Sequence, residues 1–517
     1  MMSTGERIDA AIKEARSARI RERILERDTS VWTTDPSVAK MINNSLGWLT
    51  VAEQMMGIVP ELRQFAEEVR RQFRHVMVCG MGGSSLCPEV LARTFGQQPG
   101  FPELLVLDST DPDVIAAFLE RIEVEQCLFV IASKSGTTTE PNVFYKFWYD
   151  RLQSSENFAV ITDPGSPLAD EPFDNVFLNQ SDIGGRYSAL SFFGVLPAVL
   201  AGVDIETLLQ LATNPDLSRT ALKLGTTLGE WANAGRDKVT FIIDPRLATL
   251  GLWIEQLIAE STGKQGKGIL PVVGEPLGEP SVYGDDRVFV SIGLPDSDLN
   301  LEPLANAGHP VIRRELTDLY DLGAEFFVWE FATACAGWRL GINPFDQPNV
   351  QEAKDATKEL LAEFTKNGRL PDDTTETSFD DAVRSQLARV KPGDYIAFLN
   401  YIEETPEFDQ RLQRIRTQLR DTTHCATTVG YGPRFLHSTG QLHKGGPDTG
   451  VFFQLGAKDH TDFPVPGEAY TFSILKEAQA LGDFRALKAR GRRVVRIDLG
   501  DDLSSGLDRL ENALLSN

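Results

Sequence analysis

The stretch His75-Val76-Met77-Val78-Cys79-Gly80-Met81-Gly82-Gly83-Ser84 decides the fold class. It is a short apolar run that ends in glycines, which is typical of a buried strand followed by a strand-to-helix turn. Similar apolar runs follow, with helix-like segments between them, at residues 104–108, 127–131 and 158–162. Strands that alternate with helices predict a parallel, doubly wound sheet, in which ligands bind beyond the carboxyl ends of the strands.

The sequence around this stretch divides into four parts. Residues 1–72 keep a helical period and predict a helical N-terminal segment, and residues 73–215 form the first α/β unit. Residues 216–370 predict a second, less regular α/β unit, and residues 371–517 a C-terminal α/β unit behind a polar, acidic linker at 370–380. The candidate strands of these two units are residues 239–243, 288–292, 311–312, 395–399, 426–429, 451–453 and 494–497.

Composition excludes several classes of protein. The chain has 517 residues, of which 42% are hydrophobic, so it can build more than one core. The net charge of −23 disfavours nucleic acid and anionic membranes as partners, and no apolar run is long enough for a membrane helix. The N-terminus lacks an apolar signal core, and the five scattered cysteines fit reduced core thiols, so we expect a cytoplasmic protein.

The segment Ser133-Lys134-Ser135-Gly136-Thr137-Thr138 is the first candidate ligand site. It follows an apolar strand and combines hydroxyls, an ammonium group and a glycine, which is the mixture that a phosphate group prefers. The alternative is a helix N-cap, which needs only one hydroxyl. The excess of hydroxyls therefore favours phosphate, bound by Ser133, Lys134, Ser135, Thr137 and Thr138.

The glycine-rich turn at Gly82-Gly83-Ser84 is a second candidate for phosphate binding. Glycines let a backbone approach a ligand closely, and a helix N-terminus offers free N–H groups to an anion. Turns of this kind are common, however, and a purely structural role is equally compatible with the sequence.

Together the two loops resemble the sugar-isomerase domain, and more specifically the phosphoglucose isomerase family. Four further motifs carry the resemblance. Gly184-Gly185-Arg186-Tyr187-Ser188 is similar to the family's Gly-Gly-Arg-x-Ser signature, and Glu260-Ser261-Thr262-Gly263-Lys264 to its Glu-Ser-Asn-Gly-Lys segment. Phe345-Asp346-Gln347 resembles its Phe-Asp-Gln motif, and Leu436-His437-Ser438-Thr439-Gly440-Gln441 a run found in some bacterial members. The resemblance implies two sugar-isomerase domains, at 73–215 and 216–370.

One departure distinguishes the chain from this family pattern. The family's histidine motif lies between its Glu and Phe-Asp-Gln motifs, whereas here it follows Lys354, in the third unit. This order resembles the isomerase half of fused transaldolase/phosphoglucose isomerase proteins, although no transaldolase half is present. In the family the histidine comes from a neighbouring subunit. We therefore hypothesise that His437 acts within its own chain, so that a monomer as well as a homodimer could be active.

The resemblance also implies the roles of individual residues. Glu260 would be the base that moves a proton between C1 and C2, and Arg186, freed by two preceding glycines, would stabilise the enediolate. His437 and Lys354 would open the sugar ring, with His443 a weaker alternative, and Gln256 and Gln347 would bind substrate oxygens. From spacing alone, a surface glutamate, a structural arginine and a solvated lysine remain alternatives for Glu260, Arg186 and Lys354.

The expected reaction interconverts glucose 6-phosphate and fructose 6-phosphate, a step of glycolysis and gluconeogenesis, and needs no cofactor or metal. Two alternatives remain open at this point. One is a non-catalytic sugar-phosphate sensor, and the other is an isomerase that acts on mannose 6-phosphate. The only partner expected is the small-molecule sugar phosphate.

Overall fold

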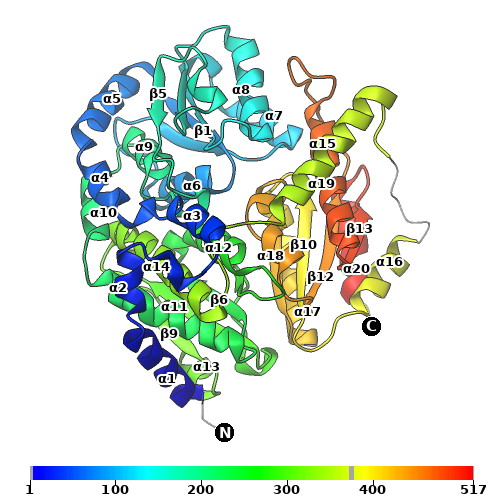
Figure 1. Cartoon of the computed structure of the whole chain (residues 1–517). Coiled ribbons are helices and arrows are strands. Elements are labelled where there is room, and N and C mark those ends of the chain that lie inside the picture. The colour runs from blue at the N-terminus through cyan, green and yellow to red at the C-terminus, as the bar shows by residue number, and fades with distance from the viewer. Residues whose placement is uncertain (1–3, 372–377, 516–517) are drawn as a thin grey trace.

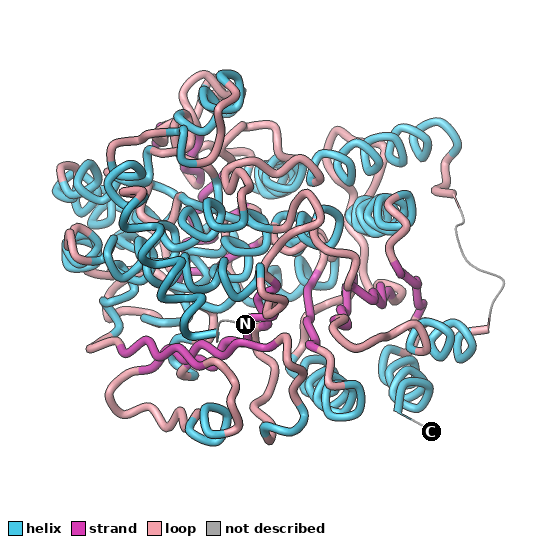
Figure 2. The backbone as a smooth tube through the Cα atoms, turned by 60° about the horizontal axis from the view of Figure 1, so that its bottom comes forward, coloured by secondary structure: helices cyan, strands magenta, loops and turns pink. Residues whose placement is uncertain are grey.

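The computed structural model describes residues 4–371 and 378–515. Three separate sheets carry the fold, and every strand pair in them is parallel. Helices flank each sheet (Figure 1), so the predicted α/β class is confirmed. In both views the C-terminal unit lies to one side of the other two (Figures 1 and 2). Among the described residues, no helix combines the length and apolarity required to cross a bilayer.

The N-terminal segment is helical, as its period predicts. Its helices are α1 (Thr4–Ser17), α2 (Ile20–Leu25), α3 (Pro36–Asn43), α4 (Val51–Met56) and α5 (Val59–Gln72). Helix α1 packs on α11 (Leu217–Asn233), where Arg7 and Arg339 both pair with the buried Glu230. The segment is therefore attached to the second unit through a charged cluster as well as through apolar contacts.

The first sheet has the strand order β2-β1-β3-β4-β5. Its strands are β1 (His75–Gly80), β2 (Glu103–Leu107), β3 (Cys127–Ala132), β4 (Phe158–Thr162) and β5 (Asn175–Leu178). Its helices include α6 (Leu86–Phe95), α7 (Pro112–Arg121), α8 (Thr139–Leu152) and α9 (Phe192–Leu200). The four expected strands are present. The fifth, β5, was not predicted because it is a short edge strand whose side chains are partly buried or exposed.

The second sheet has the order β7-β6-β8-β9. Its strands are β6 (Lys238–Ile243), β7 (Leu270–Val272), β8 (Arg287–Gly293) and β9 (Val311–Glu315). Helices α10 (Ile205–Ala212), α12 (Leu250–Thr262), α13 (Glu302–Asn306) and α14 (Leu322–Leu340) belong with it. Sequence analysis missed β7, which is three residues long and contains Pro271, a residue typical of edge strands.

The third sheet has the order β11-β10-β12-β13. Its strands are β10 (Tyr395–Tyr401), β11 (Ala426–Tyr431), β12 (Gly450–Gly456) and β13 (Arg493–Asp498). Its helices are α16 (Phe379–Leu387), α17 (Pro406–Thr423), α18 (Gly440–Gly445), α19 (Phe472–Ala489) and α20 (Leu503–Leu515). Helix α15 (Val350–Asn367) packs along α19, so it lies against this unit (Figure 1). Of the linker predicted at 370–380, residues 372–377 lie outside the described part, and α16 begins within its end.

All three sheets share one topology. In each, the first strand lies between the second and the third, and the fourth follows on the far side of the third. The connections leave in opposite directions where the first and third strands meet, which opens a crevice at the carboxyl ends of the strands. Both candidate phosphate loops follow strands of the first sheet, so they lie at one such edge.

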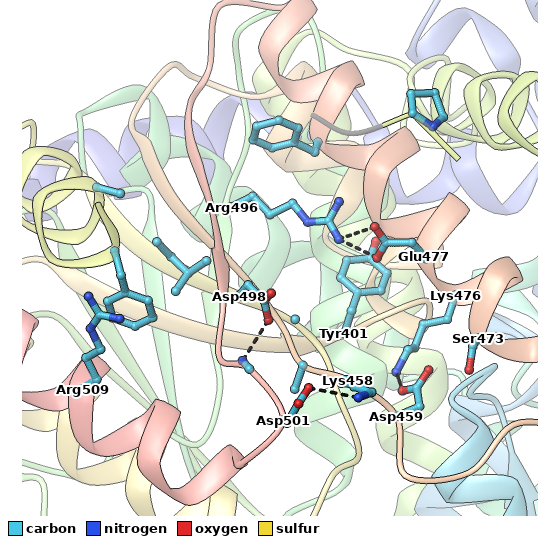
Figure 3. Close-up of a pocket in the computed structure, with 18 residues that line it drawn as sticks. Tyr401, Lys458, Asp459, Ser473, Lys476, Glu477, Arg496, Asp498, Asp501 and Arg509 are labelled. Carbon is cyan, nitrogen blue, oxygen red and sulfur yellow. Dashed lines mark hydrogen bonds and ion pairs between the residues drawn. The ribbon is translucent and has the colours of Figure 1, made fainter. Parts of the chain in front are cut away.

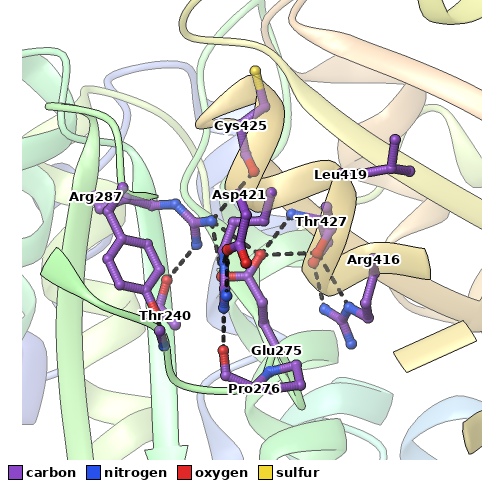
Figure 4. Close-up of polar contacts among 12 residues, drawn as sticks. Thr240, Glu275, Pro276, Arg287, Arg416, Leu419, Asp421, Cys425 and Thr427 are labelled. Atoms are coloured by element: carbon purple, nitrogen blue, oxygen red, sulfur yellow. Dashed lines mark hydrogen bonds and ion pairs between the residues drawn. The ribbon is translucent and has the colours of Figure 1, made fainter. Parts of the chain in front are cut away.

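A buried polar cluster joins the second and third units (Figure 4). Glu275 and Arg287 form an ion pair at 2.8 Å, and both side chains are 0% exposed. Glu275 also accepts hydrogen bonds from the backbone N–H of Thr427, at 2.9 Å, and from its hydroxyl, at 2.8 Å. Arg416 donates to the backbone oxygens of Val273, at 3.2 Å, and Thr427. Burial would raise the pKa of Glu275, but Arg287 and Arg416 hold it below its usual value.

Candidate active site

The hydroxyl loop connects β3 to α8, as the sequence predicts. Ser133 donates to Thr138 Oγ1 at 3.2 Å, and the hydroxyls of Ser135 and Thr137 lie 2.9 Å apart. Thr138 occupies the N-cap position of α8, but its side chain makes no capping hydrogen bond. The hydroxyls therefore contact one another instead of closing the helix end, and phosphate binding by this loop stays a prediction.

Lys134 has a different position from the one its motif suggests. Its ammonium group pairs with Asp163, which follows β4, and donates to the backbone oxygen of Ser181 at 3.0 Å. The positive charge of Lys134 is therefore largely compensated by a carboxylate of the neighbouring loop. A phosphate at the hydroxyl loop would need another source of positive charge.

Helix α15 brings two lysines to the hydroxyl loop. A cavity of about 130 Å³ is lined by Ser135, Thr137 and Thr138 on one side and by Lys354 and Lys358 on the other. The lysines are one helical turn apart on the same face of α15. Within the described part of the chain, neither forms an ion pair. Sequence analysis identified Lys354 but not Lys358, whose spacing of four residues from Lys354 was the available signal.

His437 lies on the wall of the same cavity. Its Nε2 is 3.2 Å from Glu140 Oε1, and Gln479 donates to that oxygen at 2.7 Å. Burial would raise the pKa of Glu140, but His437 and Lys354 lower it to below its usual value. Glu140 thus presents an acceptor that orients the imidazole. Sequence analysis missed Glu140, although it directly continues the hydroxyl motif, and it missed Gln479, which no motif indicates.

The glycine turn lies directly beneath His437. Gly82 has φ +57°, and a Cβ atom there would stand 2.6 Å from Gln256 Nε2 and 3.0 Å from the backbone oxygen of His437. A Cβ on Gly83 would collide with the backbone oxygen of Gly185. Both glycines therefore allow neighbouring loops to approach, and the adjacent Ser84 is buried. The presence of glycines at this turn therefore has a structural explanation, in addition to the predicted role in phosphate binding.

Replacing Gly82 with alanine is expected to displace His437 from Glu140. The left-handed backbone disfavours alanine, and the new methyl group needs space that Gln256 and His437 occupy. We expect activity to fall about 10- to 100-fold, because misplacement by about 1 Å can have this effect. Gly368→Ala is the matched control, since Gly368 also has a left-handed backbone, with φ +70° and ψ +9°, but open space around it. Equal losses in the two variants would contradict this explanation.

Glu260 and Arg186 form the second part of the site. Glu260 lies in the last turn of α12, and its Oε1 is 3.4 Å from Arg186 Nη1. The Arg186 side chain is 4% exposed and donates to Ser261 Oγ at 2.7 Å and to Gln347 Oε1 at 3.0 Å. Its Nη2 donates to the backbone oxygen of Pro344 at 2.7 Å. The two preceding glycines suggested a free guanidinium. The structure instead holds it in place beside Glu260.

Gln256 links the two parts. Its Nε2 donates to the backbone oxygen of His437 at 2.7 Å and lies 3.3 Å from Glu260 Oε2. Because Gln256 and Glu260 are four residues apart on α12, they share one helix face. The structure thus brings Glu260, Arg186, Gln256 and Gln347 into one hydrogen-bonded group that reaches His437.

Lys264 adds a cation that sequence analysis did not assign. It donates to Asp346 Oδ1 at 2.6 Å, and its side chain is 1% exposed. Burial, together with the neighbouring positive charge of Arg186, lowers the pKa of Lys264 to about 8. It lies at the end of the Glu-Ser-x-Gly-Lys motif, which was a usable signal for its position near Glu260.

His443, the weaker alternative to His437, lies elsewhere. It is buried, and its Nδ1 is 2.8 Å from the hydroxyl of Tyr395. Burial and the adjacent Lys444 hold its pKa well below the usual value. These contacts indicate a structural histidine in the core of the third unit.

A larger cavity, of about 580 Å³, lies in the third unit (Figure 3). Charged side chains line it, but they pair with one another: Arg496 with Glu477, Lys476 with Asp459, and Lys458 with Asp501. These three cations therefore already have carboxylate partners. Several predicted site residues line the smaller cavity, and Gln256 connects the group around Glu260 to His437 on its wall, so we place the candidate site there.

Comparison with known families and proteins shows which of them this chain resembles. A family model described as phosphoglucose isomerase matches residues 49–269, which include both loops, Arg186 and Glu260. The match ends before Gln347, Lys354 and His437. A glucose-6-phosphate isomerase from Symbiobacterium thermophilum is 27% identical over 386 residues, covering 61% of this chain and 86% of the relative. One from Leptospira interrogans is 26% identical over 420 residues, covering 67% and 93%.

These matches support the phosphoglucose isomerase family. Solved structures agree on the fold. A hypothetical protein from Thermus thermophilus has a TM-score of 0.57 at 24% identity and covers 69% of this chain and 97% of its own. A glucose-6-phosphate isomerase from Chlamydia trachomatis has a TM-score of 0.54 at 21% identity, covering 69% and 86%. In this chain, the histidine motif lies in the third unit, beyond the residues that the family model matches.

Proposed function

We propose that the protein is an aldose–ketose isomerase that interconverts glucose 6-phosphate and fructose 6-phosphate. The observation that carries the proposal is the convergence of Glu260, Arg186 and His437 on one place, linked by Gln256. The similarity to glucose-6-phosphate isomerases supports the choice of substrate. A protein that only binds a sugar phosphate would need the hydroxyl loop. It would not need Glu260 held beside Arg186, or Glu140 held beside His437.

Proton transfer is the role we propose for Glu260. Aldose–ketose isomerisation removes a proton from C2 or C1 and returns it to the other carbon through an enediolate, so one carboxylate can serve in both directions. Arg186 Nη1, beside that carboxylate, would stabilise the negative oxygen of the enediolate. Because the other nitrogens of Arg186 are held by Ser261 and Pro344, the charge is positioned before the reaction begins.

Ring opening is the role we propose for His437, and binding of the phosphate is the role we propose for Lys354 and Lys358. The imidazole exchanges a proton with the ring oxygen, while Glu140 fixes its orientation. Lys354 and Lys358 would supply positive charge to a phosphate at the hydroxyl loop. That supply is needed because the net charge of the chain is −23 and Lys134 is paired with Asp163.

A coupled assay of the purified protein tests the proposal directly. Turnover of fructose 6-phosphate and glucose 6-phosphate is the expected result. Turnover of mannose 6-phosphate alone would move the assignment to that substrate. Binding of all three sugar phosphates without turnover would replace the isomerase with a sensor.

We also propose that one chain completes the site. His437 and Glu140 belong to the same chain and are 297 residues apart in sequence. Co-expressed Glu260→Gln and His437→Ala chains are therefore expected to show no more isomerase activity than the two variants assayed separately. Each variant co-expressed with the wild type is the control for expression. Recovery of activity in the mixed sample would mean that sites are shared between subunits.

A further inference from the structure

The short helix η10 (Arg434–His437) lies across the carboxyl edge of the first sheet although it belongs to the third unit. Strand β1 lies between β2 and β3 in that sheet, and the glycine turn after β1 is directly below the helix. Residues three apart in a 3₁₀ helix stack on one side. Arg434 and His437 are spaced in this way, so both can reach the first unit.

Each of these two side chains meets a carboxylate of the first unit. Arg434 forms a two-pronged contact with Asp108, with Nε and Nη2 at 2.9 and 2.8 Å from the two carboxylate oxygens. His437 meets Glu140 at 3.2 Å. Asp108 directly follows β2, and Glu140 lies in the first turn of α8, after β3. The helix is therefore held on both sides of β1.

The contact between Arg434 and Asp108 has the features of a strong anchor. Asp108 is 3% exposed and Arg434 24% exposed, so water screens the pair only in part. A two-pronged arginine–carboxylate contact also fixes direction, which a single ammonium group cannot do. Arg434 Nη1 additionally contacts Glu404 of the third unit at 3.1 Å. The guanidinium thus joins the first and third units immediately beside His437.

We infer that Arg434 and Asp108 are positioning residues, which hold η10 so that His437 faces Glu140 and the sugar-phosphate cavity. This inference rests on the proposed function for its kinetic consequences, but not for its structural ones. Neither residue touches the cavity that holds the hydroxyl loop. Their effect is expected to pass through the placement of His437.

A double-mutant cycle with His437 tests the inference. Arg434→Gln is expected to lower kcat about 10- to 100-fold and to change KM little, because a displaced catalytic group loses rate more than substrate affinity. In a His437→Gln background, the same change should cost less than about twofold. Arg434→Lys should be intermediate, because it keeps the charge but loses the two-pronged contact. Asp108→Asn should follow Arg434→Gln.

Arg93→Gln is the matched control. Arg93 and Arg434 both line a cavity of about 840 Å³, and Arg93 pairs with Glu89 at 2.9 Å; among the described residues, no hydrogen bond or ion pair joins Arg93 to η10. This variant should keep wild-type kcat. If Arg434→Gln and His437→Gln instead lower kcat by independent, multiplying factors, the inference is wrong.

Hydrogen–deuterium exchange separates this inference from the proposed function. Arg434→Gln should raise exchange in the peptide that covers residues 432–440, and Arg93→Gln should not. This readout holds even if the wild type shows no isomerase activity, which would overturn only the function. Unchanged exchange in Arg434→Gln would overturn the positioning role.

Discussion

Glu260→Gln is expected to lower kcat by about 10²- to 10⁴-fold while leaving sugar-phosphate binding in place. Glutamine has nearly the same size as glutamate and can keep the contacts to Gln256 and Arg186, but it cannot accept the proton of C1 or C2. The loss should therefore appear in kcat, since the substrate contacts at the hydroxyl loop are unchanged. Calorimetric titration with fructose 6-phosphate checks the binding, and the coupled assay checks turnover.

Glu61→Gln is the control for this substitution. Glu61 is an exposed glutamate in the first turn of α5, far in sequence from the site, and its replacement should leave kcat unchanged. A Glu260→Gln enzyme with kcat within about threefold of the wild type would remove Glu260 as the base. The proton transfer would then have to be reassigned to another group in the same cluster.

Glu275→Ala is expected to destabilise the protein by about 3–5 kcal/mol, the range found when one partner of a buried ion pair is removed. The change leaves the Arg287 guanidinium buried without its carboxylate, and it removes both hydrogen bonds that Thr427 donates across the unit boundary. Calorimetric unfolding should show a lower Tm. Because the third unit carries His437, we also expect isomerase activity to be lost at lower temperature than in the wild type.

Two further variants test the reason for this loss. Asp296→Ala removes an exposed partner of Arg246 and should cost no more than about 1 kcal/mol. Glu275→Ala combined with Arg287→Ala should be more stable than Glu275→Ala alone, because the charge of Arg287 no longer lies buried without its carboxylate. Additive destabilisation in the double variant would mean that the apolar contacts, and not the ion pair, hold this boundary.

Local sequence patterns predict the architecture well, for a simple reason. Buried parallel strands need continuous apolar runs such as Cys127–Ala132, and the glycine and hydroxyl turns that follow them are equally visible. The strands that sequence analysis missed, β5 and β7, are short and lie at sheet edges. Their pairing depends on a neighbouring strand more than on their own residues.

The candidate site also contains some residues that sequence motifs indicate and others that they do not. Arg186, Glu260 and His437 lie in motifs that are visible along the chain, so the sequence alone was enough to propose them as candidates. Glu140 and Gln479 were missed because only their contacts in the folded chain identify them. Glu140 contacts His437, and Gln479 contacts Glu140. Lys134 shows the opposite case, since its motif suggests phosphate whereas the structure pairs it with Asp163.

Local sequence patterns predicted two parallel α/β units, a C-terminal α/β unit and several candidate residues for isomerase chemistry, because strand period and local motifs depend on neighbours along the chain. Only the tertiary structure decided how a histidine in the third unit meets a loop in the first. That meeting depends on contacts such as Arg434 with Asp108, which are 326 residues apart. Ion pairs and buried carboxylates have no periodic signature, so their partners appear only when the units have packed.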